Sequence, residues 1–192
     1  MAPKFKVLVM VGSLRTGSFS RMTARALSRT TDALECEIAE IGMLPLYNED
    51  LEKEGPPQDW IAFRDRVRAS DAVLFVTPEY NRSIPGCLKN AIDVGSRPYG
   101  KSVFEKKPAG IVSISTGAVG GFGANHHLRQ CLVFLDMPAM QGPEVYIANI
   151  AKYFDDQGKI TVPETEELLR KFMAAFTTWI DANHLPRHAR AA

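Results

Sequence analysis

Three continuous apolar runs constrain the fold of this sequence more than any other feature. They are FKVLVMV at Phe5–Val11, AVLFVT at Ala72–Thr77 and AGIVSIS at Ala109–Ser115. Each run is continuous rather than alternating, which is typical of parallel strands that helices cover on both faces. The runs therefore predict the centre of a buried parallel sheet.

Helical segments and two weaker strands fill the intervals between these runs. The spacing of apolar residues predicts helices over 20–31, 59–69, 84–96 and 125–135, and further strands over 34–41 and 145–150. A last helix is expected after Thr161-Val-Pro-Glu164, whose spacing is that of a capping box. The segment 42–57, which contains three prolines, is expected to be a surface connection.

Five strands interleaved with helices predict an α/β fold, namely a doubly wound five-stranded parallel sheet with helices on both faces. We expect a single domain over residues 1–185 and a loose basic tail at 186–192. Sheets of this kind bind ligands at the carboxyl ends of their strands. The loops after the first, third and fourth strands are therefore the expected binding site.

The charge of the chain is nearly balanced, with 23 Lys and Arg against 22 Asp and Glu. Nucleic-acid-binding proteins usually concentrate basic charge, and diffusing electron carriers usually carry one dominant sign, so neither class is favoured. The three cysteines are widely spaced, which is typical of a protein in a reducing cytoplasm. No apolar stretch reaches the length of a membrane span, so we expect neither a membrane nor a nucleic-acid partner.

The loop after the first strand carries a cluster of hydrogen-bond donors. It reads GSLRTGSFS from Gly12 to Ser20 and opens a helix, so backbone N–H groups, hydroxyls and the Arg15 guanidinium converge there. A phosphate monoester suits such a set of donors. The alternative interpretation is an ordinary capped turn, in which Ser20 only begins the helix.

Two familiar nucleotide-binding loops do not match this segment. A Walker loop needs Lys and then Ser or Thr at the positions that Ser18 and Phe19 occupy, so the main contacts to a triphosphate and its magnesium are missing. A dinucleotide fingerprint needs its second glycine where Leu14 stands.

The segments after the third and fourth strands can hold a flat ring. PEYNRSIPG at 78–86 is stiffened by two prolines, although a rigid turn before a helix is the simpler interpretation of this segment taken alone. STGAVGGFG at 115–123 carries four glycines, which permit close backbone approach but are equally expected in an ordinary loop. Both segments fall at the strand ends where a ligand is expected, and this favours the binding interpretation.

His126 and His127 are adjacent on a predicted helix, so their side chains point about 100° apart and do not form the i, i+4 pair of a metal site. We expect them on the helix surface or at a subunit contact, and we expect no metal. Cys87 has no evident histidine partner and is expected to pack rather than to act as a nucleophile.

Three motifs stand in the order that one known family shows. They are GSLRTGSFSR at 12–21, PEYNRSIPGCLKNAID at 78–93, and STGAVGG at 115–121 followed by HLRQCLVFL at 127–135. Together they make the chain closely resemble the NADPH-dependent FMN reductases, especially the bacterial quinone and chromate reductases, over nearly its whole length. The resemblance implies a flavodoxin-like fold, FMN as the bound cofactor, and NADPH or NADH as co-substrate.

The resemblance also assigns residues to parts of the cofactor. The residues that match the phosphate loop are Ser13, Arg15, Ser18, Phe19 and Ser20. Those that match the segment along the isoalloxazine ring are Pro78, Glu79, Tyr80 and Asn81. Those that match the loop beside the polar edge of the ring and the nicotinamide are Ser115, Thr116, Gly117, Gly120 and Gly121. Arg82 is our candidate for steering an anionic nicotinamide phosphate or substrate.

These expectations describe an enzyme in which the flavin, and no side chain, carries the chemistry. NAD(P)H reduces the flavin, and a quinone, free flavin, chromate or a similar small acceptor then takes the electrons in a ping-pong cycle. We expect the helix start after Gly121 to steady the reduced ring. A non-enzymatic flavodoxin-like electron carrier is the alternative function.

The resemblance further implies a homodimer or homotetramer, because members of the family are usually dimers or pairs of dimers. The expected contacts are the helix after Pro85 and the helix around His127–Leu135. Close relatives carry a tyrosine where His126 aligns and a basic residue where Gly123 aligns. These two departures leave the acceptor preference and the tetramer contacts open.

Overall fold

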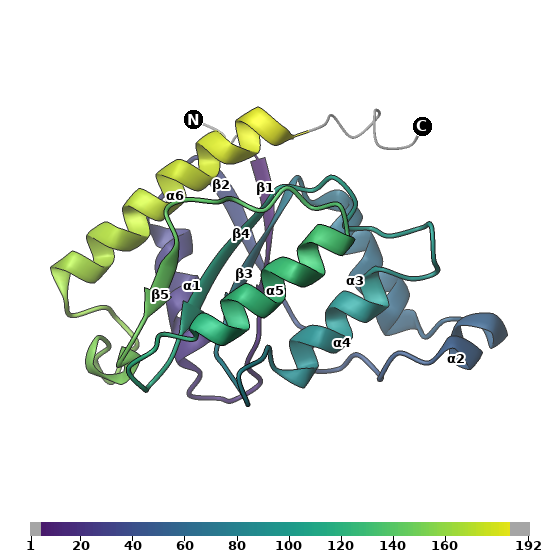
Figure 1. Cartoon of the computed structure of the whole chain (residues 1–192), viewed down its shortest axis with the longest axis horizontal. Helices are drawn as coiled ribbons and strands as arrows, with labels where there is room; N and C mark the ends of the chain where they lie inside the picture. Colours follow the sequence, from purple (N-terminus) through teal and green to yellow (C-terminus); the bar gives the residue numbers. More distant parts are fainter. Residues whose placement is uncertain (1–4, 185–192) are drawn as a thin grey trace.

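The computed structural model describes residues 5–184 and contains one five-stranded sheet in the order β2-β1-β3-β4-β5. All four neighbouring pairs are parallel. This is the flavodoxin-like strand order, so the predicted fold is confirmed (Figure 1). The expected tail at 186–192 lies outside the described residues. The strands are β1 (Phe5–Val11), β2 (Leu34–Ala39), β3 (Ala72–Thr77), β4 (Ala109–Ile114) and β5 (Val145–Ile147).

Helices cover both faces of the sheet, as expected (Figure 1). On one face lie α1 (Phe19–Arg29) and α6 (Pro163–Asn183). On the other face lie α3 (Gln58–Ala69), α4 (Gly86–Gly95) and α5 (Phe122–Phe134).

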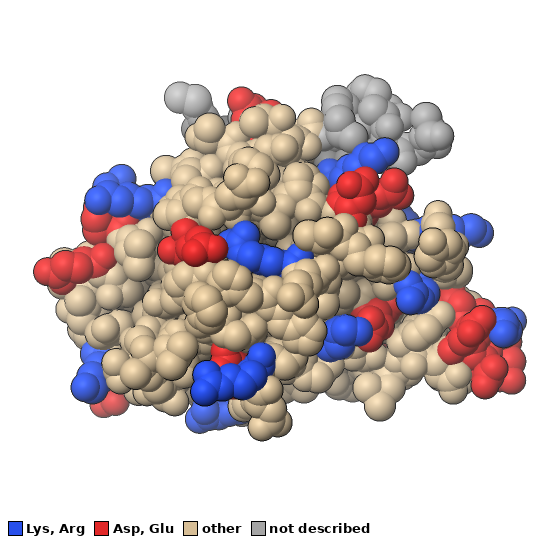
Figure 2. All heavy atoms as spheres, viewed as in Figure 1, with Lys and Arg blue, Asp and Glu red and all other residues tan. Residues whose placement is uncertain are grey.

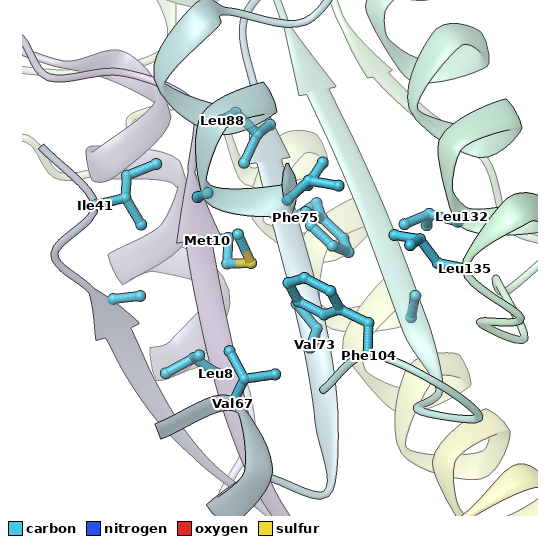
Figure 3. Packing of buried hydrophobic residues seen from close by; sticks show 14 of the residues in the cluster. Leu8, Met10, Ile41, Val67, Val73, Phe75, Leu88, Phe104, Leu132 and Leu135 are labelled. Atoms are coloured by element: carbon cyan, nitrogen blue, oxygen red, sulfur yellow. The ribbon is translucent and has the colours of Figure 1, made fainter. Parts of the chain in front are cut away.

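Strand β1 sends its side chains to the two faces in turn. Leu8 and Met10 pack in the hydrophobic cluster beneath α3, α4 and α5, which Figure 3 shows at close range. Val7, Val9 and Val11 pack in a second cluster beneath α1 and α6. Burial on both faces explains why the strand is apolar at successive positions.

The surface connection 42–57 contains a short helix that the sequence analysis missed, α2 (Glu49–Glu54). Asn48 caps its first turn. The buried Arg64 of α3 then holds the helix, because its guanidinium donates two hydrogen bonds to the Glu52 carboxylate. The same guanidinium also donates to the backbone oxygen of Val94 in α4.

The start of the last helix is the second correction. The cap residue of α6 is Val162, and no side chain caps the first turn, so the predicted capping box between Thr161 and Glu164 is wrong. Pro163 occupies the first turn, where its missing N–H removes one group that a cap would bind. The predicted last helix is itself present, and its buried residues include Leu169, Phe172, Phe176 and Ile180.

No helix among residues 5–184 is long and apolar enough to cross a membrane. Acidic and basic side chains are interspersed over the face shown in Figure 2. The three cysteines are all free thiols.

Candidate functional site at the carboxyl edge of the sheet

The loops after β1, β3 and β4 meet in one pocket at the carboxyl edge of the sheet, the lower edge of the molecule in Figure 1. The pocket brings together residues from segments more than ninety positions apart in the chain. Twelve residues line it: Ser13, Arg15, Ser18, Phe19, Ser20, Pro78, Glu79, Tyr80, Ile114, Ser115, Thr116 and Ile150. All but the two isoleucines were expected from the sequence.

The loop after β1 leaves polar groups available to a ligand. Ser18 begins α1, and its hydroxyl accepts a hydrogen bond from the Arg21 N–H at 3.1 Å. Ser13 and Ser20 are 8% and 2% exposed, and their hydroxyls have no hydrogen-bond partner among residues 5–184. An unpaired buried hydroxyl costs about 1–3 kcal/mol. Because both line the pocket, they are suited to bind the oxygen atoms of a ligand.

Positive charge converges on the same loop. Arg15 is exposed at the pocket, and none of the ion pairs among residues 5–184 involves it. The N–H groups of Phe19 and Ser20 lie in the first turn of α1, where no intrahelical acceptor exists and the helix dipole is positive. Unpaired hydroxyls, a free guanidinium and a helix start together suit a phosphate dianion.

The loop after β3 is a tight turn closed by its own backbone. Tyr80 and Ser83 exchange two backbone hydrogen bonds, of 3.0 and 2.9 Å. Between them Asn81 and Arg82 have φ angles of 51° and 63°, and two successive positive φ angles define a type I′ turn. Arginine adopts this conformation reluctantly, so the surroundings must hold the turn. Asn81 itself does not line the pocket.

Two side chains fix this turn to α5. The Glu79 carboxylate accepts a hydrogen bond from the Ala124 N–H at 2.9 Å, and the Ser83 hydroxyl lies 2.6 Å from Nδ1 of His127. Gly123 makes room for this contact, because a Cβ there would lie 2.9 Å from Oε2 of Glu79. The start of α5, which we expected to steady a reduced ring, is therefore partly occupied by a carboxylate.

Packing against β5 shapes the loop after β4. Gly120 and Gly121 have φ angles of 64° and 75°. A Cβ at Gly120 would lie 2.8 Å from the carbonyl carbon of Tyr146, and one at Gly121 would lie 3.0 Å from the Ile114 oxygen. Neither glycine lines the pocket, and neither does Gly117. Positive φ angles and close backbone contacts account for Gly120 and Gly121, whereas Gly117 has a φ outside the positive range and a nearest contact of 3.4 Å, to Oγ of Ser115.

The two isoleucines supply apolar wall that the sequence analysis missed. Ile114 could have been expected, because it ends a buried strand at the binding edge. Ile150 follows a turn at Asn149, whose φ is 51°, and its N–H donates to the Ser115 oxygen at 3.0 Å. The turn also explains why β5 ends at Ile147 rather than at residue 150 as predicted.

From α5, His126 contacts β5 and His127 contacts the loop after β3. Nε2 of His126 lies 3.1 Å from the Tyr146 hydroxyl, and its ring centroid lies 4.2 Å from that of Phe122. Within residues 5–184, no group of three His, Cys, Asp or Glu side chains is placed to hold a metal ion. Burial raises the pKa of the Cys87 thiol, which packs against the core.

Comparison with known proteins identifies the family. The family model for NADPH-dependent FMN reductases matches residues 5–152. The chain belongs to this family. A quinone reductase of Pseudomonas putida is 58% identical over 184 residues, which are 95% of this chain and 98% of that protein. An NAD(P)H-dependent FMN reductase of Pseudomonas aeruginosa is 42% identical over 181 residues, which are 94% and 97% of the two chains.

A solved structure extends the comparison to three dimensions. FerB, a flavoenzyme NAD(P)H:(acceptor) oxidoreductase from Paracoccus denitrificans, superimposes with a TM-score of 0.88 at 39% identity. The match covers 94% of this chain and 100% of that one. The predicted enzyme class is confirmed: this FMN reductase is an oxidoreductase that uses FMN, with NAD(P)H as electron donor.

Proposed function

We propose that this FMN reductase holds its cofactor in the pocket at the carboxyl edge and passes electrons from NAD(P)H to quinones, free flavin, chromate or similar small acceptors. The observation that carries the proposal is that the buried hydroxyls of Ser13 and Ser20 and the guanidinium of Arg15 line this pocket without a hydrogen-bond or ion-pair partner within residues 5–184. A flavin phosphate carries the charge and the acceptor atoms that this set lacks. The quinone reductase from Pseudomonas putida supports quinones as the acceptor class.

The polar side chains of the loop after β1 and the residues of the two later loops line different parts of the chain's contribution to the pocket, and we assign the two parts of FMN accordingly. We place the FMN phosphate against Ser13, Arg15, Ser18 and Ser20 with Phe19 beside it. The ring then lies against Pro78, Glu79 and Tyr80 on one side and Ser115 and Thr116 on the other, with Ile114 and Ile150 as apolar wall. Asn81, Gly117, Gly120 and Gly121 act from outside the lining, by setting the shape of the two later loops.

When bound, FMN would provide the site that accepts hydride from NAD(P)H and passes electrons on, so the residues of this chain need only bind and orient it. Tyr80 is 55% exposed, which leaves the pocket accessible at that side. The Arg82 side chain is 81% exposed on the adjoining turn, and we propose that it steers an anionic nicotinamide phosphate or acceptor towards the pocket.

We also propose that the enzyme is a homodimer or homotetramer that associates through α4 and α5. Val133 and Phe134 at the end of α5 are 79% and 72% exposed, and a groove between α4 and α5 adjoins Phe134. Contiguous exposed apolar surface of this kind is typical of association sites. The three free thiols support a cytoplasmic location.

The first test removes the guanidinium from the phosphate end. Arg15→Ala should raise the Kd for FMN by about 10- to 100-fold, since a charge-assisted hydrogen bond contributes about 1.5–3 kcal/mol. Fluorescence titration of the apoprotein with FMN measures this change. Arg25→Ala, at an exposed position of α1, the helix that follows this loop, is the matched control and should leave the Kd unchanged. An unchanged Kd for Arg15→Ala would contradict the phosphate assignment.

The second test separates the enzyme from an electron carrier. Anaerobic addition of NADPH or NADH to the FMN-loaded protein should bleach the visible absorbance of oxidised flavin, which a stopped-flow experiment measures. Quinone, free FMN or chromate should then restore it. A protein that keeps FMN but is reduced by neither nicotinamide would be a carrier.

A further inference from the structure

The pocket contains one positive and one negative side chain. Of the twelve residues that line it, only Arg15 is basic and only Glu79 is acidic. Arg15 precedes α1, whereas Glu79 follows β3, so the two charges come from different loops. A phosphate explains Arg15. An uncharged flavin ring does not by itself explain a carboxylate.

The Glu79 carboxylate is held firmly, and its charge is only weakly compensated. Its side chain is 15% exposed, and it accepts a hydrogen bond from the Ala124 N–H at 2.9 Å. Among the described residues its one ion pair is with Nη1 of Arg82, 4.0 Å away on a side chain that is 81% exposed. Solvent weakens such an ion pair strongly. Glu79 therefore places net negative charge at the pocket wall.

This carboxylate also covers the start of α5. The first turn of a helix carries partial positive charge on its free N–H groups, which would otherwise favour a ligand that becomes negative. Glu79 binds one of these groups and opposes the dipole at that end. Both effects have the same sign, since each makes added negative charge in the pocket less favourable.

We propose that Glu79 is an electrostatic tuning residue that keeps the reduction potential of bound FMN low, an inference that rests on the proposed function. Hydride carries two electrons and one proton, so its donor leaves as NAD(P)⁺. A flavin ring held here would gain one negative charge on accepting the hydride, until a second proton arrived from solvent. A fixed carboxylate opposes that charge. The reduced cofactor is then bound less tightly than it would be beside a neutral residue, which makes the loaded enzyme a stronger reductant.

Glu79→Gln tests this proposal because the amide keeps the shape and still accepts from the Ala124 N–H, but carries no charge. The ratio of affinities for reduced and oxidised FMN should rise about tenfold, which raises the two-electron midpoint potential by about 30 mV. Anaerobic titration against a reference dye measures the potential. Glu105→Gln is the matched control, because Glu105 is exposed and precedes β4 at the opposite edge of the sheet; its potential should equal that of the wild type.

A second pair of variants separates the charge from the hydrogen bond. Glu79→Ala should also raise the potential, but it should lower the unfolding temperature of the apoprotein, since Ala124 loses its acceptor. Arg82→Gln removes the partial compensation and should lower the potential, which keeps the proposal testable even if the Glu79 variants do not fold.

The outcomes divide cleanly. If wild-type protein binds FMN and Glu79→Gln leaves the potential unchanged or lowers it, the tuning role is wrong and the proposed function stands. A rise or no change with Arg82→Gln would have the same meaning. If the wild type takes up no FMN at all, the proposed function and this inference fail together.

Discussion

The loop after β1 and the two loops after β3 and β4 meet in the same pocket but are built in opposite ways. The first loop is open: Ser13 and Ser20 are buried with unpaired hydroxyls, and Arg15 has no ion pair among the described residues. The later loops are closed. Tyr80 and Ser83 exchange two backbone hydrogen bonds, and Gly120 packs against Tyr146.

This difference separates residues that are expected to bind the ligand from residues that hold the shape of the pocket. Polar groups that the protein leaves unpaired gain partners only when a ligand arrives, so their removal should weaken binding more than folding. Groups that are already paired hold the shape of the pocket, so their removal should weaken folding first. The predictions below test this division.

The largest expected effect is on the closed loop after β4. Gly120→Ala should lower the free energy of unfolding by about 2–4 kcal/mol, because alanine disfavours positive φ and its Cβ would overlap the backbone of Tyr146. Urea denaturation of the apoprotein measures this loss. Gly17→Ala in the open loop is the matched control, since a Cβ there meets nothing within 4 Å. Equal losses for the two variants would remove the distinction between the loops.

The next effect is on the open loop. Ser20→Ala should weaken FMN binding about tenfold, since one hydrogen bond contributes roughly 1–1.5 kcal/mol, yet the apoprotein should be as stable as wild type or slightly more stable. Flavin titration and thermal unfolding of the apoprotein measure the two quantities. Ser28→Ala is the control, because its hydroxyl already donates to the Ala24 oxygen in the same helix. A large loss of apoprotein stability in Ser20→Ala would show that this hydroxyl is structural.

Ser18 both caps a helix and lines the pocket, so its removal should affect apoprotein stability and FMN binding together. Its hydroxyl caps the first turn of α1 and also lines the pocket. Ser18→Ala should therefore lower apoprotein stability by about 1 kcal/mol and weaken FMN binding as well. The same two measurements apply. A change in only one of them would assign Ser18 to one role alone.

The smallest effect concerns Tyr146, against which Gly120 packs. Burial, with added effects of Glu144, raises the pKa of Tyr146 to about 12 from its ordinary value of 10.0. Below about pH 10 the phenol is protonated in both states, so it adds no pH dependence. Between about pH 10 and pH 12 the unfolded chain loses this proton first, so stability falls as pH rises. Tyr146→Phe should show a shallower fall in urea denaturation over this range, and an identical slope would contradict it.

The strands were predictable because burial on both faces of the sheet requires apolar residues at successive positions of β1, β3 and β4, and such continuous runs are visible in the sequence. Helix α2 was not, because its main anchor is the distant Arg64 on α3 rather than a local apolar pattern. The capping box failed for a related reason. Thr161 and Glu164 have the required spacing, but the chain enters α6 one residue later and begins it with a proline.

The site was predictable as far as strand ends and residue types determine it. The hydroxyls and the arginine of the first loop stand close together in the sequence, so they can be recognised as a candidate anion site without knowledge of the fold. A glycine shows only that backbone freedom is needed, so the sequence does not reveal that Tyr146 is the close neighbour of Gly120. The partner of Glu79 lies 45 residues further along the chain, and pairings of that kind arise only from the fold.

The sheet divides the hydrophobic interior into two separate layers, and the pocket loops run into helices of both. The first loop continues into α1 on one side, whereas the later loops continue into α4 and α5 on the other. In the proposed binding mode, one cofactor would contact loops that lead into helices of both layers and would so connect the two layers. Loading should then slow amide hydrogen exchange in α1 and α5 together, although no side chain of either helix belongs to the other's layer.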